Sequence, residues 1–173
     1  MDWTKEDNKH SANVPEGYHR LEIVNFYHGK KGGGRFESRG GDPQVLLIFE
    51  DADGRQATAM HTLSEKAAWT MQKLLSRLGH DMAALNERSL DIADFTDANV
   101  CRELLIDRSC WAHVTHDQSG HKTYTNVEPM HADEVPADVL QRAKQRREPD
   151  RRTVTAGDVI DDTPHFDDDD IPF

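Results

Sequence analysis

The segment QVLLIFEDADG, residues 44–54, decides the fold of this chain. Its first seven residues form a nearly continuous apolar run with the length of a buried β-strand. The Asp-Gly pair at positions 53 and 54 supplies residues that tolerate positive φ in a tight hairpin turn. Residues 55–61 are therefore predicted to return as a second strand beside the first.

Another strand is predicted upstream of this hairpin. Residues 18–27, YHRLEIVNFY, are rich in β-branched and aromatic side chains, and they follow the turn signal Pro15-Glu16-Gly17. Residues 28–41, between the two strands, are predicted to form a flexible, glycine-rich and basic loop. Residues 1–13 are polar and aperiodic, and we expect a flexible arm there.

Helical periodicity begins after residue 61. Thr62 and Glu65 fit a capping box, and an apolar stripe that ends at Gly79 predicts a helix. A second short helix is predicted over residues 97–105, with Thr96 as its N-cap. Residues 110–116 and 121–127 are predicted to form a last hairpin around a turn at 117–120, and residues 136–147 a short charged helix.

The predicted order is three strands, a helical insertion and two more strands. It favours a mainly β fold with helices: a five-stranded antiparallel barrel of the oligonucleotide-binding (OB) type, with the insertion between strands 3 and 4. We expect this OB-like domain over residues 14–131 and a short helix or linker over 132–148. Residues 149–173 lack periodicity and are predicted to be a disordered acidic tail.

Composition limits the functions that this chain can have. The 173 residues carry a formal net charge of −11, which argues against a general binder of polyanions. Any contact with nucleic acid must therefore come from a local basic patch. The two cysteines form no CxxC pair, and no apolar run approaches membrane-spanning length, so we expect a cytoplasmic protein with free thiols.

The last seven residues combine an acidic run with an apolar tip: Asp167, Asp168, Asp169, Asp170, Ile171, Pro172 and Phe173. The Phe173 ring can fill an apolar pocket while the terminal carboxylate beside it accepts a bidentate Arg. Pro172 restricts the backbone, which lowers the ordering cost on binding. A tail that only maintains solubility would explain the Asp run but not Ile-Pro-Phe, so we predict a partner-docking peptide.

This tip resembles the terminal peptide of bacterial single-stranded DNA-binding (SSB) proteins. The resemblance implies that it recruits host enzymes of DNA replication, recombination and repair. Residues 15–130 are also similar to small phage- and prophage-encoded proteins with OB-type bodies, through residues 15–18, 49–54, 78–79 and 124–127. The resemblance places the protein in a bacterial host or a phage-infected cell, and a homo-oligomer is one expectation for its assembly.

A non-specific binder of single strands needs cations along the phosphates and rings on which bases stack. Loop 28–41 carries such a ring, Phe36, and four cations opposed only by Glu37: Lys30, Lys31, Arg35 and Arg39. We predict that these five residues contact DNA. The alternative is a disordered hairpin tip with scattered charge.

Strand alternation divides the last hairpin into two faces. Small and branched residues suited to a core share one face: Cys110, Ala112, Val114, Thr123, Thr125 and Val127. The other face carries Trp111, His113, Thr115, Lys122, Tyr124 and Asn126. We predict DNA contacts from Trp111, His113, Lys122 and Tyr124; the alternative is that Trp111 and Tyr124 pack beneath a helix or loop. Phe49 and Trp69 are predicted to be core residues.

The sequence thus predicts a protein that binds single-stranded DNA without strong sequence specificity and recruits partner enzymes through its tip. No catalytic constellation, cofactor motif or metal-ligand spacing is evident, so we expect neither an enzyme nor a metalloprotein. His113 and His116, for example, would face opposite sides of a strand. The alternative is an interaction protein that mimics the SSB tail, without binding DNA, to divert or inhibit host enzymes; the acidic body favours it.

Overall fold

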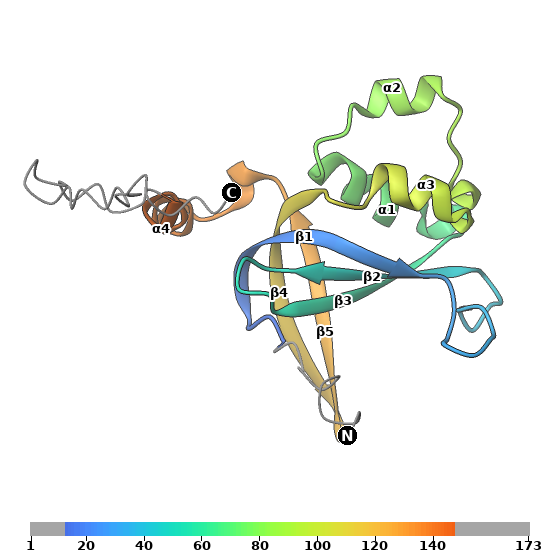
Figure 1. Ribbon diagram of the computed structural model, residues 1–173, viewed down its shortest axis with the longest axis horizontal. Coiled ribbons are helices and arrows are strands. Elements are labelled where there is room, and N and C mark those ends of the chain that lie inside the picture. Colours follow the sequence, from blue (N-terminus) through green and yellow to red (C-terminus); the bar gives the residue numbers. More distant parts are fainter. Residues whose placement is uncertain (1–12, 148–173) are drawn as a thin grey trace, which may run out of the picture.

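A five-stranded antiparallel sheet carries the fold of the computed structural model, which describes residues 13–147 (Figure 1). Its strands are β1 (Gly17–Tyr27), β2 (Gln44–Glu50), β3 (Gln56–Thr62), β4 (Ser109–Ser119) and β5 (Lys122–Met130). They lie in the order β3-β2-β1-β4-β5, and every neighbouring pair is antiparallel. The predicted mainly β class and antiparallel sheet are confirmed.

Helices occupy the connection between β3 and β4, as predicted. They are the 3₁₀ turn η1 (Glu65–Ala67), α1 (Ala68–Arg77), α2 (Met82–Glu87), the 3₁₀ helix η2 (Ile92–Thr96) and α3 (Ala98–Leu104). The turn η3 (Ala132–Glu134) and helix α4 (Ala137–Arg147) follow β5. None of the helices in residues 13–147 has the length and apolarity that crossing a bilayer requires.

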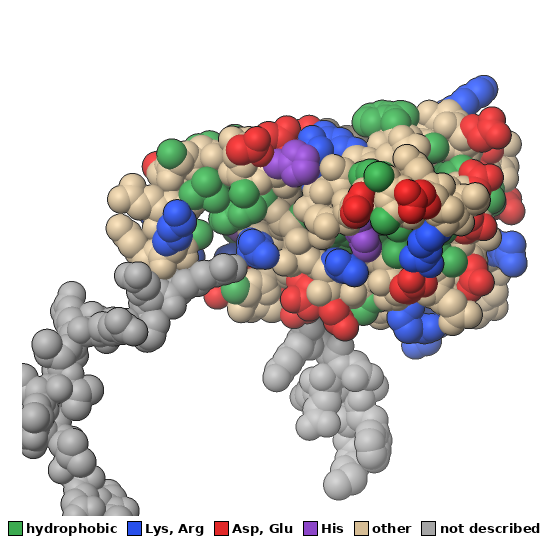
Figure 2. Space-filling view, turned by 90° about the horizontal axis from the view of Figure 1, so that it is seen from above, with side chains coloured by type: hydrophobic (Ala, Val, Ile, Leu, Met, Phe, Trp, Pro, Cys, Tyr) green, Lys and Arg blue, Asp and Glu red, His purple; other side chains and the backbone are tan. Residues whose placement is uncertain are grey.

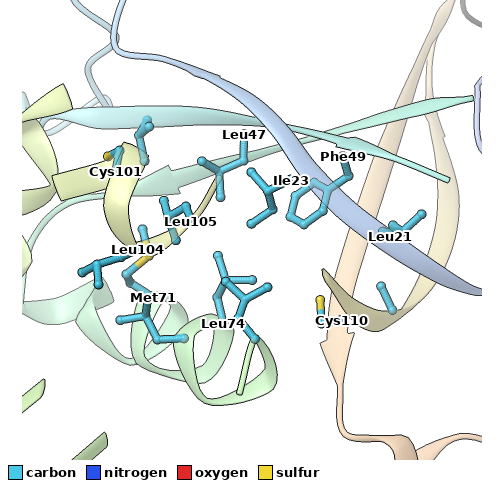
Figure 3. Close-up of a cluster of buried hydrophobic side chains, with 14 of the residues drawn as sticks. Leu21, Ile23, Leu47, Phe49, Met71, Leu74, Cys101, Leu104, Leu105 and Cys110 are labelled. Atoms are coloured by element: carbon cyan, nitrogen blue, oxygen red, sulfur yellow. The ribbon is translucent and has the colours of Figure 1, made fainter. Parts of the chain in front are cut away.

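The core lies between one face of the sheet and the helical insertion (Figure 3). Phe49, Leu47 and Val45 alternate along β2 and are fully buried, which confirms the prediction for Phe49. Met71 and Leu74 of α1 meet this face, together with Leu104 and Leu105 at the end of α3. Trp69 is not a core residue: 63% of its surface is exposed, because α1 turns Met71, Leu74 and Leu75 toward the sheet instead.

A β-bulge changes the phase of β1 halfway along its length. The pairing of β1 with β2 shifts between Ile23 and Asn25. Leu21 and Ile23 face the core before the bulge, and the even-numbered Phe26 packs against it afterwards. Tyr27 therefore lies on the outer face of the sheet, opposite the helices.

The sheet is not closed into a barrel, so this part of the OB prediction is wrong. The edge strands β3 and β5 approach each other but form no ladder in residues 13–147. Residues 13 and 14 occupy the free edge of β3 instead: Asn13 bridges Gln56, and the Val14 amide donates to the Gln56 carbonyl at 3.1 Å. The Val14 carbonyl also lies 2.9 Å from Nε2 of His116 in β4. This short segment thus spans part of the opening.

The last hairpin turns later than predicted. Ser119 pairs with Lys122, so the turn is Gly120-His121, with Gly120 at φ 63°, and residues 117–119 extend β4. The change of two residues leaves the faces intact, because cross-strand partners lie on the same side of the sheet. The predicted division of this hairpin into two faces is therefore confirmed.

The predicted caps are wrong at both helices. Thr62 ends β3, and Ser64 precedes η1 without a side-chain capping bond. Asp97, not Thr96, caps α3 by accepting a hydrogen bond from the Asn99 amide at 2.8 Å.

Candidate nucleic-acid interface

The β1–β2 loop, residues 28–43, is a hydrogen-bonded structure built from two tight turns. The Lys30 amide donates to the Gly34 carbonyl at 3.0 Å, and the Ser38 amide donates to the Asp42 carbonyl at 2.9 Å. Phe36 joins the two turns: its amide donates to His28 and its carbonyl accepts from Gln44. The loop is thus folded rather than an irregular hairpin tip. The Phe36 side chain is half-buried.

Gly29 is the residue on which the first turn of this loop depends. A Cβ at position 29 would collide with the carbonyl oxygen of Gly34, which is fixed backbone. A side chain at Gly40, in the second turn, would meet only ordinary contacts with Ser38 and Asp42. Close backbone approach therefore requires glycine at position 29 but not at position 40, whereas Gly41 in the second turn has a positive φ of 83°.

The four predicted cations of this loop are exposed: Lys30, Lys31, Arg35 and Arg39. None of them enters an ion pair within residues 13–147. Five other cations in the described residues are paired with carboxylates: Arg55, Lys73, Arg77, Arg88 and Arg142. The loop thus groups four exposed, unpaired cations within ten residues, and a smaller unpaired set, Lys144 and Arg146, lies on α4.

His28 anchors this loop to the helical insertion. Its Nε2 lies 2.7 Å from the Phe95 carbonyl at the end of η2, and Cys101 Sγ donates to the same carbonyl at 3.1 Å. Burial, and then the charge of Asp97, raise the pKa of the Cys101 thiol to about 12. A thiol with so high a pKa is not a nucleophile at neutral pH. The bonds of His28 and Cys101 to the Phe95 carbonyl therefore have a structural role.

The predicted face of the β4–β5 hairpin offers fewer available rings than the sequence suggested. The His113 ring already stacks on Tyr18, with ring centroids 4.6 Å apart, and Trp111 is half-buried. Tyr124 is 51% exposed and Lys122 is exposed, so neither packs beneath a helix or loop.

The nine predicted DNA contacts do not form one continuous site. The β1–β2 loop follows the C-terminal end of β1. The N-terminal end of β1 lies beside the middle of β4, because Gly17 pairs with Val114. From there β4 continues away from the loop to the hairpin tip, which carries Lys122 and Tyr124. β1 has 11 residues and would span roughly 35 Å if fully extended. Figure 1 accordingly shows the loop and the hairpin tip at different corners of the sheet.

The structure adds an apolar row that the sequence prediction missed: Tyr27, Leu46 and Met60. These residues are direct cross-strand neighbours on β1, β2 and β3, on the outer face of the sheet. Tyr27 is 48% and Met60 44% exposed, and Asn25 Nδ2 donates to the Tyr27 hydroxyl at 2.9 Å. Because His28 follows Tyr27 directly, the row adjoins the β1–β2 loop.

Part of the signal for this row was present in the sequence. Alternation along residues 44–50 places Leu46 opposite the core, and the Asp-Gly hairpin then sets Met60 beside it. The bulge in β1 hid Tyr27, because simple alternation from Leu21 and Ile23 places odd-numbered residues in the core.

Acidic residues mark the opposite end of the β1–β2 pair. Glu22 and Glu50 are cross-strand neighbours there, and Asp51 follows directly. Burial of Asp51 raises its pKa, but hydrogen bonds from the backbone and side chain of Arg55 outweigh this and hold the pKa below its ordinary value. Asp51 is therefore an anion at neutral pH, and it is held in an ion pair with Arg55 at 2.6 Å.

No group of three or more metal-ligating side chains is found within residues 13–147. The predicted partner-docking residues, 167–173, lie outside the described part of the chain.

A comparison with protein-family models finds none that matches this chain, and no curated protein matches its sequence. The structure defines its class as a mainly β protein with a helical insertion, and its function has to be argued from the surface itself.

Proposed function

We propose that this protein binds single-stranded DNA without strong sequence specificity, and that the β1–β2 loop and the apolar row form the principal contact. The observation that carries the proposal is their adjacency: four unpaired cations lie next to an exposed tyrosine and methionine on an open sheet face. Non-specific single-strand binding requires this combination of phosphate-tracking charge and stacking surface.

The magnitudes agree with such a role. A base stacked on an aromatic side chain contributes about 1–3 kcal/mol, and Tyr27 is oriented for this by its bond to Asn25. Lys30, Lys31, Arg35 and Arg39 would neutralise up to four phosphates. Repulsion by Glu22 and Glu50 at the other end of β1 and β2 would favour placement of the strand across the loop end.

We also propose that the sheet is an open relative of the OB barrel. The strand order β3-β2-β1-β4-β5, the approach of β3 to β5 and the insertion after β3 support this interpretation. OB folds bind oligonucleotides on the face of strands 2 and 3 and through the loops that follow strands 1 and 4. Lys122 and Tyr124, beside the turn that follows β4, would then supply a second and weaker contact.

Residues 167–173 are proposed to act separately from the body. Their likeness to SSB tails supports recruitment of enzymes of replication, recombination and repair to the DNA that the body covers. The net charge of −11 is compatible with DNA binding only because the cations are grouped in one loop.

Titration with a labelled dT oligomer of roughly 30 nucleotides at low salt tests DNA binding, since phosphate-driven affinity is greatest there. Tyr27→Ala is expected to weaken binding about 5- to 100-fold, the equivalent of one lost stacking contact. Tyr124→Ala, an equally exposed aromatic at the far corner, is the matched control and should have a smaller effect. Absence of binding by the unmodified protein at low ionic strength would sink the proposal.

A second candidate function is an interaction protein that presents an SSB-like tip without binding DNA. The acidic helical insertion favours it, because five acidic residues oppose one Arg in residues 80–97. Reversing the charges of Lys30, Lys31, Arg35 and Arg39 separates the two candidates. The interaction protein would keep its function after this change and lose it when Phe173 is removed.

A further inference from the structure

The helical insertion contains an apolar pocket on the side of the molecule away from the outer sheet face. It has a volume of about 110 Å³ and lies between α1, α2 and η2. Met71 and Phe95 form buried parts of its wall, and Met82, Leu90 and Ile92 are half-exposed around it. A pocket of this size can hold one bulky apolar side chain.

Trp69 lies on the face of α1 next to the face that lines this pocket. Ala68 and Gln72 of α1 line the pocket. In a helix, residue 69 is rotated by about 100° from residue 68, and its side chain lies near that of residue 72, one turn further along. Trp69 is 63% exposed, the largest exposed fraction among the large hydrophobic side chains of residues 13–147. An exposed Trp beside an apolar pocket is the pattern of a binding hot spot.

Acidic residues are frequent in the segments that form the opposite walls of the pocket. Asp91 lines the pocket itself, and the segments that build α2 and η2 carry four further exposed acids: Asp81, Glu87, Asp94 and Asp97. Arg88 is the one basic residue among them, and it is paired with Glu103 at 2.9 Å. Figure 2, which looks onto the helical side, shows hydrophobic side chains at the surface, with both acidic and basic side chains around them.

We propose that this surface docks a basic segment of a partner protein, which inserts one bulky apolar side chain into the pocket and packs against Trp69. The apolar pocket selects the anchor, and the acidic walls select Lys or Arg beside it. Charge also excludes the nearest alternative occupant, the tip of this chain or of a second copy. Ile171-Pro172-Phe173 follows four consecutive Asp residues, which the walls would repel.

The test uses the full chain and a labelled amphipathic peptide of about 16 residues, with Leu on one helical face and Lys on the other. Trp69→Ala changes an exposed residue beside the pocket and Gln72→Lys an exposed residue that lines it, so neither should affect folding. Each is expected to weaken peptide binding roughly tenfold or more. Tyr124→Ala, an exposed aromatic on β5, is the matched control and should bind like the unmodified protein.

A second peptide with Glu in place of Lys should not bind, and amide shifts on adding the Lys peptide should concentrate at Met82, Leu90 and Ile92. Equal binding by the unmodified protein, Trp69→Ala and Gln72→Lys would overturn the proposal, since the peptide would then follow net negative charge alone. Equal binding of the Lys and Glu peptides would overturn it as well. None of these outcomes depends on whether the sheet binds DNA.

Discussion

At the scale of single residues, the clearest consequence of burial is at His61. Its side chain lies on the core-facing side of β3, opposite Val45, and burial lowers its pKa to about 4. His61 is therefore neutral at pH 7. In the unfolded chain the same ring has an ordinary pKa near 6.5 and takes up a proton as the pH falls.

This difference predicts how stability depends on pH. Between pH 6.5 and about 4 only the unfolded chain gains a proton at residue 61, so stability should fall across this window, by about 1–3 kcal/mol. Urea unfolding at pH 7 and pH 4.5 measures the loss. His61→Phe should remove most of the dependence, and an unchanged slope in this variant would show that other groups cause it.

A substitution at Gly29 tests whether the geometry of the β1–β2 loop matters for DNA binding. Gly29→Ala forces the backbone of the first turn apart, because the new Cβ collides with the Gly34 carbonyl. We expect several-fold weaker binding of dT oligomers, since the turn positions Lys30 and Lys31. Gly40→Ala is the matched control in the same loop and should bind normally. Equal affinity for both variants would show that the turn geometry is irrelevant to binding.

At the scale of elements, patterns that depend on local alternation could be predicted, and those that depend on tertiary contacts could not. The two faces of the β4–β5 hairpin follow from alternation alone, and a shift of the turn by two residues preserved them. The bulge in β1 could not be foreseen, because the extra residue only becomes visible against β2. Because of this bulge, Tyr27 lies on the outer face of the sheet, where it belongs to the apolar row of the candidate site.

The helical insertion shows the same limit. The stripe in α1 was evident, but Trp69 was assigned to the core because a single Trp usually is buried. Helix α2 was missed, since its six residues are too few to display a period. The open barrel also depends on tertiary contacts: β3 and β5 approach each other without a ladder, and residues 13 and 14 pair with Gln56 at the start of β3.

Residues 13–16 are therefore expected to contribute to stability as an element of the fold. Val14 is fully buried, and the segment is bonded to Gln56 of β3 and His116 of β4. Val14→Ala should lower the free energy of unfolding by about 1–3 kcal/mol through lost burial and a small cavity. Asn13→Ala, which changes an exposed side chain, is the control and should cost much less. A Val14→Ala protein as stable as the control would show that this segment is not part of the core.

At the scale of the whole molecule, charge is separated by region. Four unpaired cations lie in the β1–β2 loop at one end of the sheet, whereas acidic residues are frequent at the other end and in residues 80–97 of the helical insertion. This separation allows a chain with a net charge of −11 to attract a polyanion locally. Under the two proposals above, DNA and a basic protein segment would bind on different faces and could do so at the same time.

The salt dependence of DNA binding measures this local attraction directly. Each phosphate neutralised on a single strand contributes about −0.7 to the slope of log K against log salt concentration. Replacing Lys30, Lys31, Arg35 and Arg39 by Gln should therefore reduce the magnitude of the slope by up to about 3. Tyr27→Ala should weaken binding with little change in slope, because it removes stacking and not charge. If the Gln variant kept the full slope, the phosphates would be held by cations elsewhere in the chain, and the β1–β2 loop would lose its assigned role.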